Sequence, residues 1–226
     1  MGANTLDATD VASGWSEQVA VRNKAQQYVF EALRQMRGRL PFELRGLDSD
    51  NGSEFINDQL TRYCSEEGIT FTRSRAGRKN DNCYVEQKNW SIVRRFAGYE
   101  RFEGESALRI LNNLYGVLRE YVNFFLPTMK CVGKTREGSR VTRHYDVPKT
   151  PYQRVLDSSH VDASAKQRIE ARYRALNPAA LHRDILKYQA ALGRHAARVA
   201  TSSRIRSVPG AQHPWRQPVS IQGARG

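Results

Sequence analysis

The stretch FELRGLDSDNGSEF (residues 42–55) decides the fold, because an apolar segment there runs into an acidic turn. Residues 42–48 have the composition of a β-strand. Asp50-Asn51-Gly52 favours a turn after it, because Asn and Gly tolerate positive φ. A helix over about 54–67 and a second strand over 69–73 (ITFTR) are expected next. A strand, a helix and a strand in succession predict a mixed α/β domain.

The same alternation continues on both sides of this stretch. Residues 5–11 and 15–22 are expected to form two strands joined by a turn at Ser13-Gly14. Asn23 is expected to cap a helix that Gly38 closes. Downstream, apolar spacing predicts helices over about 82–99 and 105–125, whereas residues 126–156 show no hydrophobic period and turn basic.

Helix signals dominate the C-terminal third. Asp162 or Ser164 is expected to cap a helix that ends near Leu176, and Asn177-Pro178 to begin another that runs towards Ala200. The remaining residues have the composition of a flexible tail. The chain thus divides into an α/β domain over 1–156, a basic helical appendage over 157–200 and a tail over 201–226.

Charge is distributed unevenly along the chain. The net charge is +13 with a pI near 10.0, yet residues 1–86 carry a net −2 and residues 87–226 a net +15. Clustered Lys and Arg predict a polyanionic partner, because phosphate contacts release counterions. A ribosome-associated or simply basic protein remains an alternative on charge alone.

Cysteine content and hydropathy indicate the compartment. Three cysteines without close spacing predict no disulfide framework and favour a reducing cytoplasm. The histidines lie far from them in sequence, which argues against zinc. The sequence contains no apolar run of bilayer-spanning length and no signal pattern at its N-terminus, so we expect a cytoplasmic protein without a membrane partner.

Two carboxylates are candidates for chemistry. Asp50 ends the strand of the opening stretch, and Glu86 lies on the next helix, with residues 51–85 between them. A strand-end carboxylate and one on a neighbouring helix can converge on a divalent ion such as Mg²⁺. Taken singly, Asp50 is explained by turn chemistry and Glu86 by solvation near a helix start.

Together with their flanks, these residues resemble a known family. SDNGSEF (49–55) and NDNCYVEQKN (80–89) closely resemble the second and third parts of the D,D-35-E signature of DDE-type transposases and integrases, found in bacterial insertion sequences and retroviruses. The similarity extends over residues 5–156 through VASGW (11–15), VAVRNKAQ (19–26), RRFAGYERFEG (94–104), YVNFFLPTMK (121–130) and YDVPKTPYQRVL (145–156).

The resemblance implies an RNase H-like mixed sheet flanked by helices, and DNA transposition or integration as the function. Asp50 and Glu86 would be catalytic metal ligands for two Mg²⁺ or Mn²⁺ ions. The partners would be DNA, both element ends and target, and further copies of the chain as a homo-oligomer. A cytoplasmic, nucleoid-associated location follows from DNA as the partner.

Residues around the two carboxylates are candidates for DNA contact. One helical turn separates Asn89 from Glu86, so the two share a face. Asp48 shares the strand face of Asp50 and is either a support for it or a structural acid. Trp90 and Phe96 are expected in the core. The candidate DNA-binding residues are Arg73, Arg75, Arg78, Lys79 and Asn89.

One part of the family pattern has no match. The first catalytic Asp belongs on a first, central strand that would precede Met1, and neither Asp7 nor Asp10 takes that role. We therefore expect a truncated core with impaired catalysis and an incomplete sheet. The alternatives are a non-catalytic DNA-binding transposase remnant and, more weakly, an RNase H-like nuclease acting on RNA–DNA hybrids.

Overall fold

The structure is a computed structural model that describes residues 2–49, 58–73, 89–98, 100 and 102–206. The first half contains β1 (Asn4–Thr9), β2 (Ser16–Val21), α1 (Gln26–Arg39), β3 (Gly46–Ser49), α2 (Asp58–Glu66) and β4 (Thr70–Arg73). The second half contains the π-helical turn η2 (Asn89–Arg94), α4 (Arg95–Ala97), α5 (Gly104–Phe125), β5 (Cys131–Glu137), β6 (Arg140–Tyr145), α6 (Pro151–Asp157), α7 (Ala163–Ala175) and α8 (Pro178–Arg206). This confirms the mixed α/β class.

The described strands form three two-stranded sheets. β1 and β2 are antiparallel, with Thr9 opposite Ser16. β3 and β4 are parallel, with Ser49 opposite Arg73. β5 and β6 form an antiparallel hairpin. Within the described ranges, therefore, the strands do not join into one sheet.

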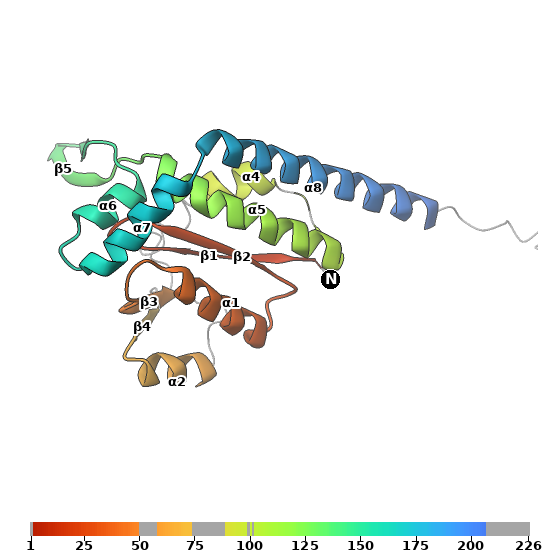
Figure 1. Ribbon diagram of the computed structural model, residues 1–226, viewed down its shortest axis with the longest axis horizontal. Coiled ribbons are helices and arrows are strands. Elements are labelled where there is room, and N and C mark those ends of the chain that lie inside the picture. The colour runs from red at the N-terminus through yellow and green to blue at the C-terminus, as the bar shows by residue number, and fades with distance from the viewer. Residues whose placement is uncertain (1, 50–57, 74–88, 99, 101, 207–226) are drawn as a thin grey trace, which may run out of the picture.

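Strand β2 is buried along its whole length because helices cover it on two sides. Val19 and Val21 pack with α1, while Ala20 packs in the cluster built on α5. Helix α8 lies beside α5 (Figure 1), and its Ile185 and Leu192 belong to that same cluster. Helix α8, which the sequence places in the C-terminal appendage, thus contributes to the core around α5.

Helix α1 also contacts the second sheet. Its Leu33 packs against a buried cluster that contains Leu60 of α2, and Leu47 of β3 packs against the same cluster. Arg37 strengthens this contact, since it donates to Tyr63 Oη at 2.6 Å and to Glu67 Oε2 at 2.8 Å. Helix α1 thus packs on both β1–β2 and β3–β4 (Figure 1).

Several predicted boundaries in the first half need correction. Asn23 does not cap α1, because the helix begins at Gln26 and Asn23 Oδ1 accepts a bond from the Ala25 N–H. Gly38 lies inside the last turn of α1 rather than after it. The strand expected over 42–48 is limited to Gly46–Ser49, because its partner β4 offers four residues for pairing.

The largest difference from the sequence expectation lies in residues 126–156, which show no hydrophobic period. The β5–β6 hairpin and α6 occupy this segment. Thr150 and Gln153 form a reciprocal capping box that starts α6, with Pro151 in its first turn. Asp162, rather than Ser164, caps α7, and α8 continues to Arg206, beyond the predicted start of the tail. No helix in the described ranges is long and apolar enough to cross a membrane.

Candidate functional site

The carboxyl ends of the parallel strands β3 and β4 lie side by side. The two segments that hold the predicted site residues follow directly from these strand ends. Ser49 and Arg73, the last residues of the two strands, lie opposite each other. Asp50 follows Ser49 in the sequence, and the basic stretch 74–79 follows Arg73. Because the carboxyl ends of adjacent parallel strands share one edge, both segments start from the same place, where ligands of open α/β sheets commonly bind.

Most of the predicted site residues lie outside the described part of the chain. This holds for Asp50 and Glu86, and for Arg75, Arg78 and Lys79 in the basic stretch. Arg73 is the last residue of β4 and Asn89 the first residue of η2, and for both the described part covers the backbone alone. Their roles as metal ligands or DNA contacts therefore stay predictions.

Two described residues border this edge. Asp48 is exposed, and its Oδ1 accepts a hydrogen bond at 2.7 Å from Thr72 Oγ1, its register partner on β4. This bond gives Asp48 a structural role in joining the two strands. Ser49 is 7% exposed, and its Oγ has no hydrogen-bond partner among the described residues.

The two aspartates near the N-terminus have local partners. Gln18 Nε2 donates to Asp7 Oδ1 at 2.8 Å across the β1–β2 pair. Asp10 Oδ2 accepts from both the N–H and the hydroxyl of Ser13, at 2.6 and 2.5 Å, in the turn between the strands. Asp10 therefore stabilises the turn between β1 and β2.

The π-helical turn η2 begins at Asn89, directly after residues 74–88, which lie outside the described part. Turns of this type are rare and are frequent at functional sites. Here Ile92 and Val93 are buried, and Phe96 of α4 packs against the cluster around α5, as predicted for it. Gln189 of α8 donates to the Phe96 carbonyl at 2.9 Å, so α8 contacts the short helix α4 that follows this turn. The side chain of Trp90, also expected in the core, lies outside the described set.

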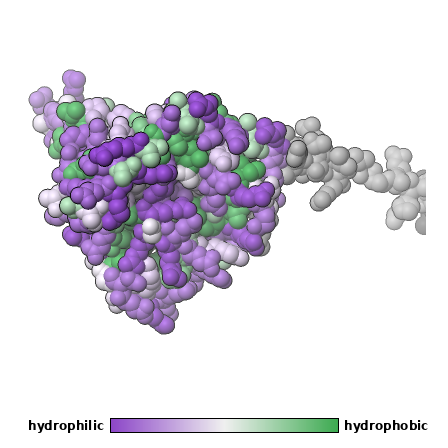
Figure 2. All heavy atoms as spheres, viewed as in Figure 1, coloured by the Kyte–Doolittle hydropathy of each residue, from purple (hydrophilic) through white to green (hydrophobic). Residues whose placement is uncertain are grey.

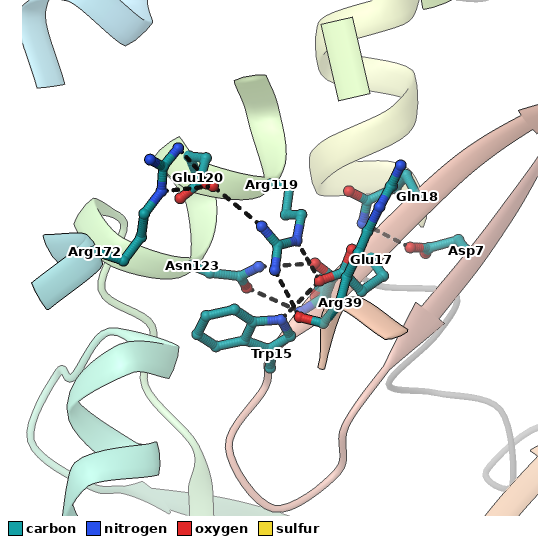
Figure 3. A network of polar contacts seen from close by, with 10 residues as sticks. Asp7, Trp15, Glu17, Gln18, Arg39, Arg119, Glu120, Asn123 and Arg172 are labelled. Atoms are coloured by element: carbon teal, nitrogen blue, oxygen red, sulfur yellow. Dashed lines mark hydrogen bonds and ion pairs between the residues drawn. The ribbon is translucent and has the colours of Figure 1, made fainter. Parts of the chain in front are cut away.

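A cluster of polar contacts joins β2 to α5 (Figure 3). Arg119 donates to Glu17 at 2.6 Å, to Glu120 at 3.1 Å and to the Arg39 carbonyl at 2.7 Å. Trp15 Nε1 also donates to Glu17, at 3.0 Å. Burial raises the pKa of the Glu17 carboxyl above its usual 4.5, and the charge of Arg119 opposes that shift.

Two asparagines of α5 bind the backbone of β2 in the same way. Asn123 accepts from the Ser16 N–H at 2.9 Å and donates to the Ser16 carbonyl at 2.8 Å. Asn112 makes the same pair of bonds to Ala20, at 2.9 and 3.0 Å. The helix thus supplies hydrogen bonds that a further strand would otherwise supply, and it fixes β2 in place.

The described residues contain no group of three or more His, Cys, Asp or Glu side chains placed to hold a metal ion.

They do contain a cationic surface that the sequence pattern did not single out, on the β5–β6 hairpin. The signal was present as alternation of Thr and Val with basic residues around Gly138, which has φ +60°.

Comparisons with known proteins give a relative without an assigned role. No protein-family model matches the sequence. The chain is similar to the uncharacterized protein y4rM of Sinorhizobium fredii, with 47% identity over 150 residues, which is 66% of this chain and 43% of that protein. The chain thus spans less than half the length of this relative.

Among solved structures, the catalytic core domain of BIV integrase aligns with a TM-score of 0.46 and 22% identity. The alignment covers 70% of this chain and 88% of that one. A likeness of this extent does not assign a fold.

Proposed function

We propose that this chain is the catalytic core of a DDE-type DNA transposase or integrase, which hydrolyses and joins DNA phosphodiesters. The observation that carries the proposal is the geometry of β3–β4. The register of this parallel pair brings the strand end before Asp50 beside the strand end before the basic stretch 74–79. A carboxylate and several cations beginning at one sheet edge suit a phosphodiester substrate.

The proposal includes a single RNase H-like sheet in the active assembly. In the described part, β1 and β3 each pair on one side, with β2 and β4 respectively. Helix α1 packs on both pairs. A strand inserted between β1 and β3 would join the pairs into one mixed sheet, and in the proposed family that strand carries the first Asp.

Asp50 and Glu86 would hold Mg²⁺ or Mn²⁺, because these hard cations prefer carboxylate oxygens. Such ions, when bound, would lower the barrier to in-line attack on the phosphodiester. Ser49, the last residue of β3, is buried, and its hydroxyl has no partner among the described residues. A structural Asp48–Thr72 bond beside it keeps the two strand ends together.

A cleavage assay tests this function. The full chain is incubated with end-labelled duplex DNA and Mg²⁺ or Mn²⁺, alongside Asp50→Ala, Glu86→Ala and the control Glu66→Ala on the exposed end of α2. We expect slow, metal-dependent nicking or joining that falls at least about a hundredfold in the first two variants. The control should keep it. Equal product from Asp50→Ala would contradict the proposal.

The separate strand pairs favour a second candidate, a DNA-binding protein that does not catalyse. Such a protein would bind DNA in a salt-sensitive way through its basic second half. Its binding would be unchanged in Asp50→Ala and Glu86→Ala, and no metal-dependent product would form.

A further inference from the structure

The β5–β6 hairpin has two chemically different faces. Lys134 lies opposite Arg143, and Arg136 lies opposite Val141 two residues further on, so these side chains share one face. The other face pairs Thr135 with Thr142 and Glu137 with Arg140. We call the first the cationic face, made of Lys134, Arg136 and Arg143 with Val141 and Tyr145.

The charges of this face are uncompensated. Lys134, Arg136 and Arg143 are all exposed, and none of the three forms an ion pair within the described ranges. Like charges placed directly opposite each other destabilise a strand pair. The Lys134–Arg143 pair therefore works against hairpin stability, and a polyanion would relieve that repulsion.

The base of the hairpin is fixed to the rest of the molecule. Arg154 of α6 donates to both oxygens of Asp146, at 2.6 and 3.2 Å, directly after β6. Lys130, directly before β5, donates from its backbone to Asp146 at 2.6 Å and from its side chain to the carbonyls of Val11 and Ala12. The hairpin itself projects at one end of the molecule (Figure 1), where polar side chains dominate the surface (Figure 2). The strands of the hairpin are thus exposed, while hydrogen bonds fix its base to the rest of the molecule.

We propose that the cationic face binds a groove of double-stranded DNA, at a place separate from the β3–β4 edge. The choice of DNA as the polyanion rests on the proposed function. A two-stranded ribbon fits the major groove, which is about 12 Å wide, and a strand of this length extends about 20 Å. Val141 and Tyr145, 47% and 50% exposed, add apolar surface on the same face for contact with sugars and base edges.

The test measures duplex affinity against salt for the full chain and two triple variants. The first is Lys134→Ala/Arg136→Ala/Arg143→Ala. The matched control is Arg34→Ala/Arg45→Ala/Arg62→Ala, which removes the same charge from exposed positions on and around α1 and α2. We expect the hairpin variant to bind at least about tenfold more weakly, with a slope of log affinity against log salt shallower by about 2 to 3. The control should bind close to wild type.

Four outcomes separate the possibilities. Equal effects of the two triple variants would overturn the hairpin site while leaving DNA as the substrate. No salt-dependent binding by the wild-type chain would overturn both this site and the proposed function. An equal loss on single-stranded DNA would overturn groove binding. The hairpin variant should also unfold at the wild-type temperature or above it, because it loses a repulsive pair; a lower midpoint with weak binding would attribute the loss to misfolding and contradict the inference.

Discussion

Charged side chains in two regions of this molecule are treated in opposite ways. In the cluster between β2 and α5, Arg119 lies between Glu17 and Glu120, and the Glu17 side chain is 1% exposed. On the β5–β6 hairpin, Lys134 faces Arg143 in full contact with solvent and without an acidic neighbour on that face. In the buried cluster each of the two glutamates is paired with Arg119, whereas the hairpin places like charges together.

This difference separates charges that maintain the fold from charges that serve a ligand. A buried ion is costly unless it is paired and hydrogen-bonded, so the ion pairs of Arg119 reduce the cost of burying Glu17 and Glu120. An exposed repulsive pair costs little but brings no benefit to the fold. Its benefit therefore lies in binding, and the net +15 of residues 87–226 agrees with a polyanion as the ligand.

Breaking the buried cluster should have the largest effect. Arg119→Met leaves Glu17 buried without its cation, and we expect a loss of about 3–5 kcal/mol in the free energy of unfolding. Denaturant titration measures it. The double variant Arg119→Met/Glu17→Gln should recover part of the loss. Independent, additive effects of the two substitutions would contradict the pairing.

Removing an asparagine of α5 should cost less. Asn123→Ala leaves the N–H and carbonyl of Ser16 unpaired in a fully buried place, for a loss of about 2–4 kcal/mol. The matched variant is Asn112→Ala, whose contact with Ala20 is partly buried, so water can replace it at lower cost. Thermal or denaturant unfolding should rank Asn123→Ala as the more damaging, and the reverse order would show that burial does not set the cost.

The Glu17 carboxyl should make stability depend on pH. Its folded-state pKa is raised by burial, so the folded state holds the proton more tightly and stability is lost as pH rises above about 4.5. Glu17→Gln removes this titration. The unfolding free energy of wild type minus that of Glu17→Gln should decrease as pH rises through this range; a flat difference would argue against the raised pKa.

The base of the hairpin should respond to pH in the opposite sense. The hydrogen bond from Arg154 lowers the pKa of Asp146 to about 2. The stabilisation from this carboxylate is therefore present above its ordinary value of 3.8 and lost as pH falls towards 2. Amide exchange in β5 and β6 should speed up over that window in wild type. In Asp146→Asn, exchange in the hairpin should already be fast at pH values above this window. Equal exchange rates in wild type and Asp146→Asn would exclude the anchoring role.

Compensating the hairpin should give the smallest change in stability. Arg143→Glu places an acid opposite Lys134 and should stabilise the hairpin by about 0.2–1 kcal/mol, while DNA binding becomes weaker. Hairpin exchange protection and duplex affinity are measured on the same sample. Improved exchange protection of the hairpin together with unchanged affinity for duplex DNA would show that the repulsive pair does not contribute to binding.

Much of the fold could be predicted from the sequence. Strong alternation and helical spacing predicted the strands of β1 and β2 and the long helix α5 within a few residues. The β5–β6 hairpin was not predicted because its strands are exposed and have no apolar face, which leaves only the weaker alternation of Thr and Val with basic residues as a signal. Helix α6 is short but did carry a local signal, the Thr150-to-Gln153 capping box after which it begins.

The site was less accessible to prediction. The resemblance of their flanking sequences selected Asp50 and Glu86 as a pair, and the structure adds the parallel register that places the strand end before Asp50 beside the strand end before residues 74–79. The role of Asp48 could not be read from two-residue alternation, because the Thr72 hydroxyl that it accepts from lies on another strand. The Arg119 cluster joins residues about a hundred positions apart, and such pairings depend on packing rather than on local pattern.

Metal binding tests the central claim most directly. The full chain, Asp50→Asn, Glu86→Gln and the control Glu66→Gln are titrated with Mn²⁺, and the bound ion is counted by electron paramagnetic resonance. The account predicts saturable binding to wild type and to the control that is lost in both of the other variants. Undiminished Mn²⁺ binding by Asp50→Asn and Glu86→Gln would show that these carboxylates are not the ligands, and the DDE-type proposal would then be contradicted.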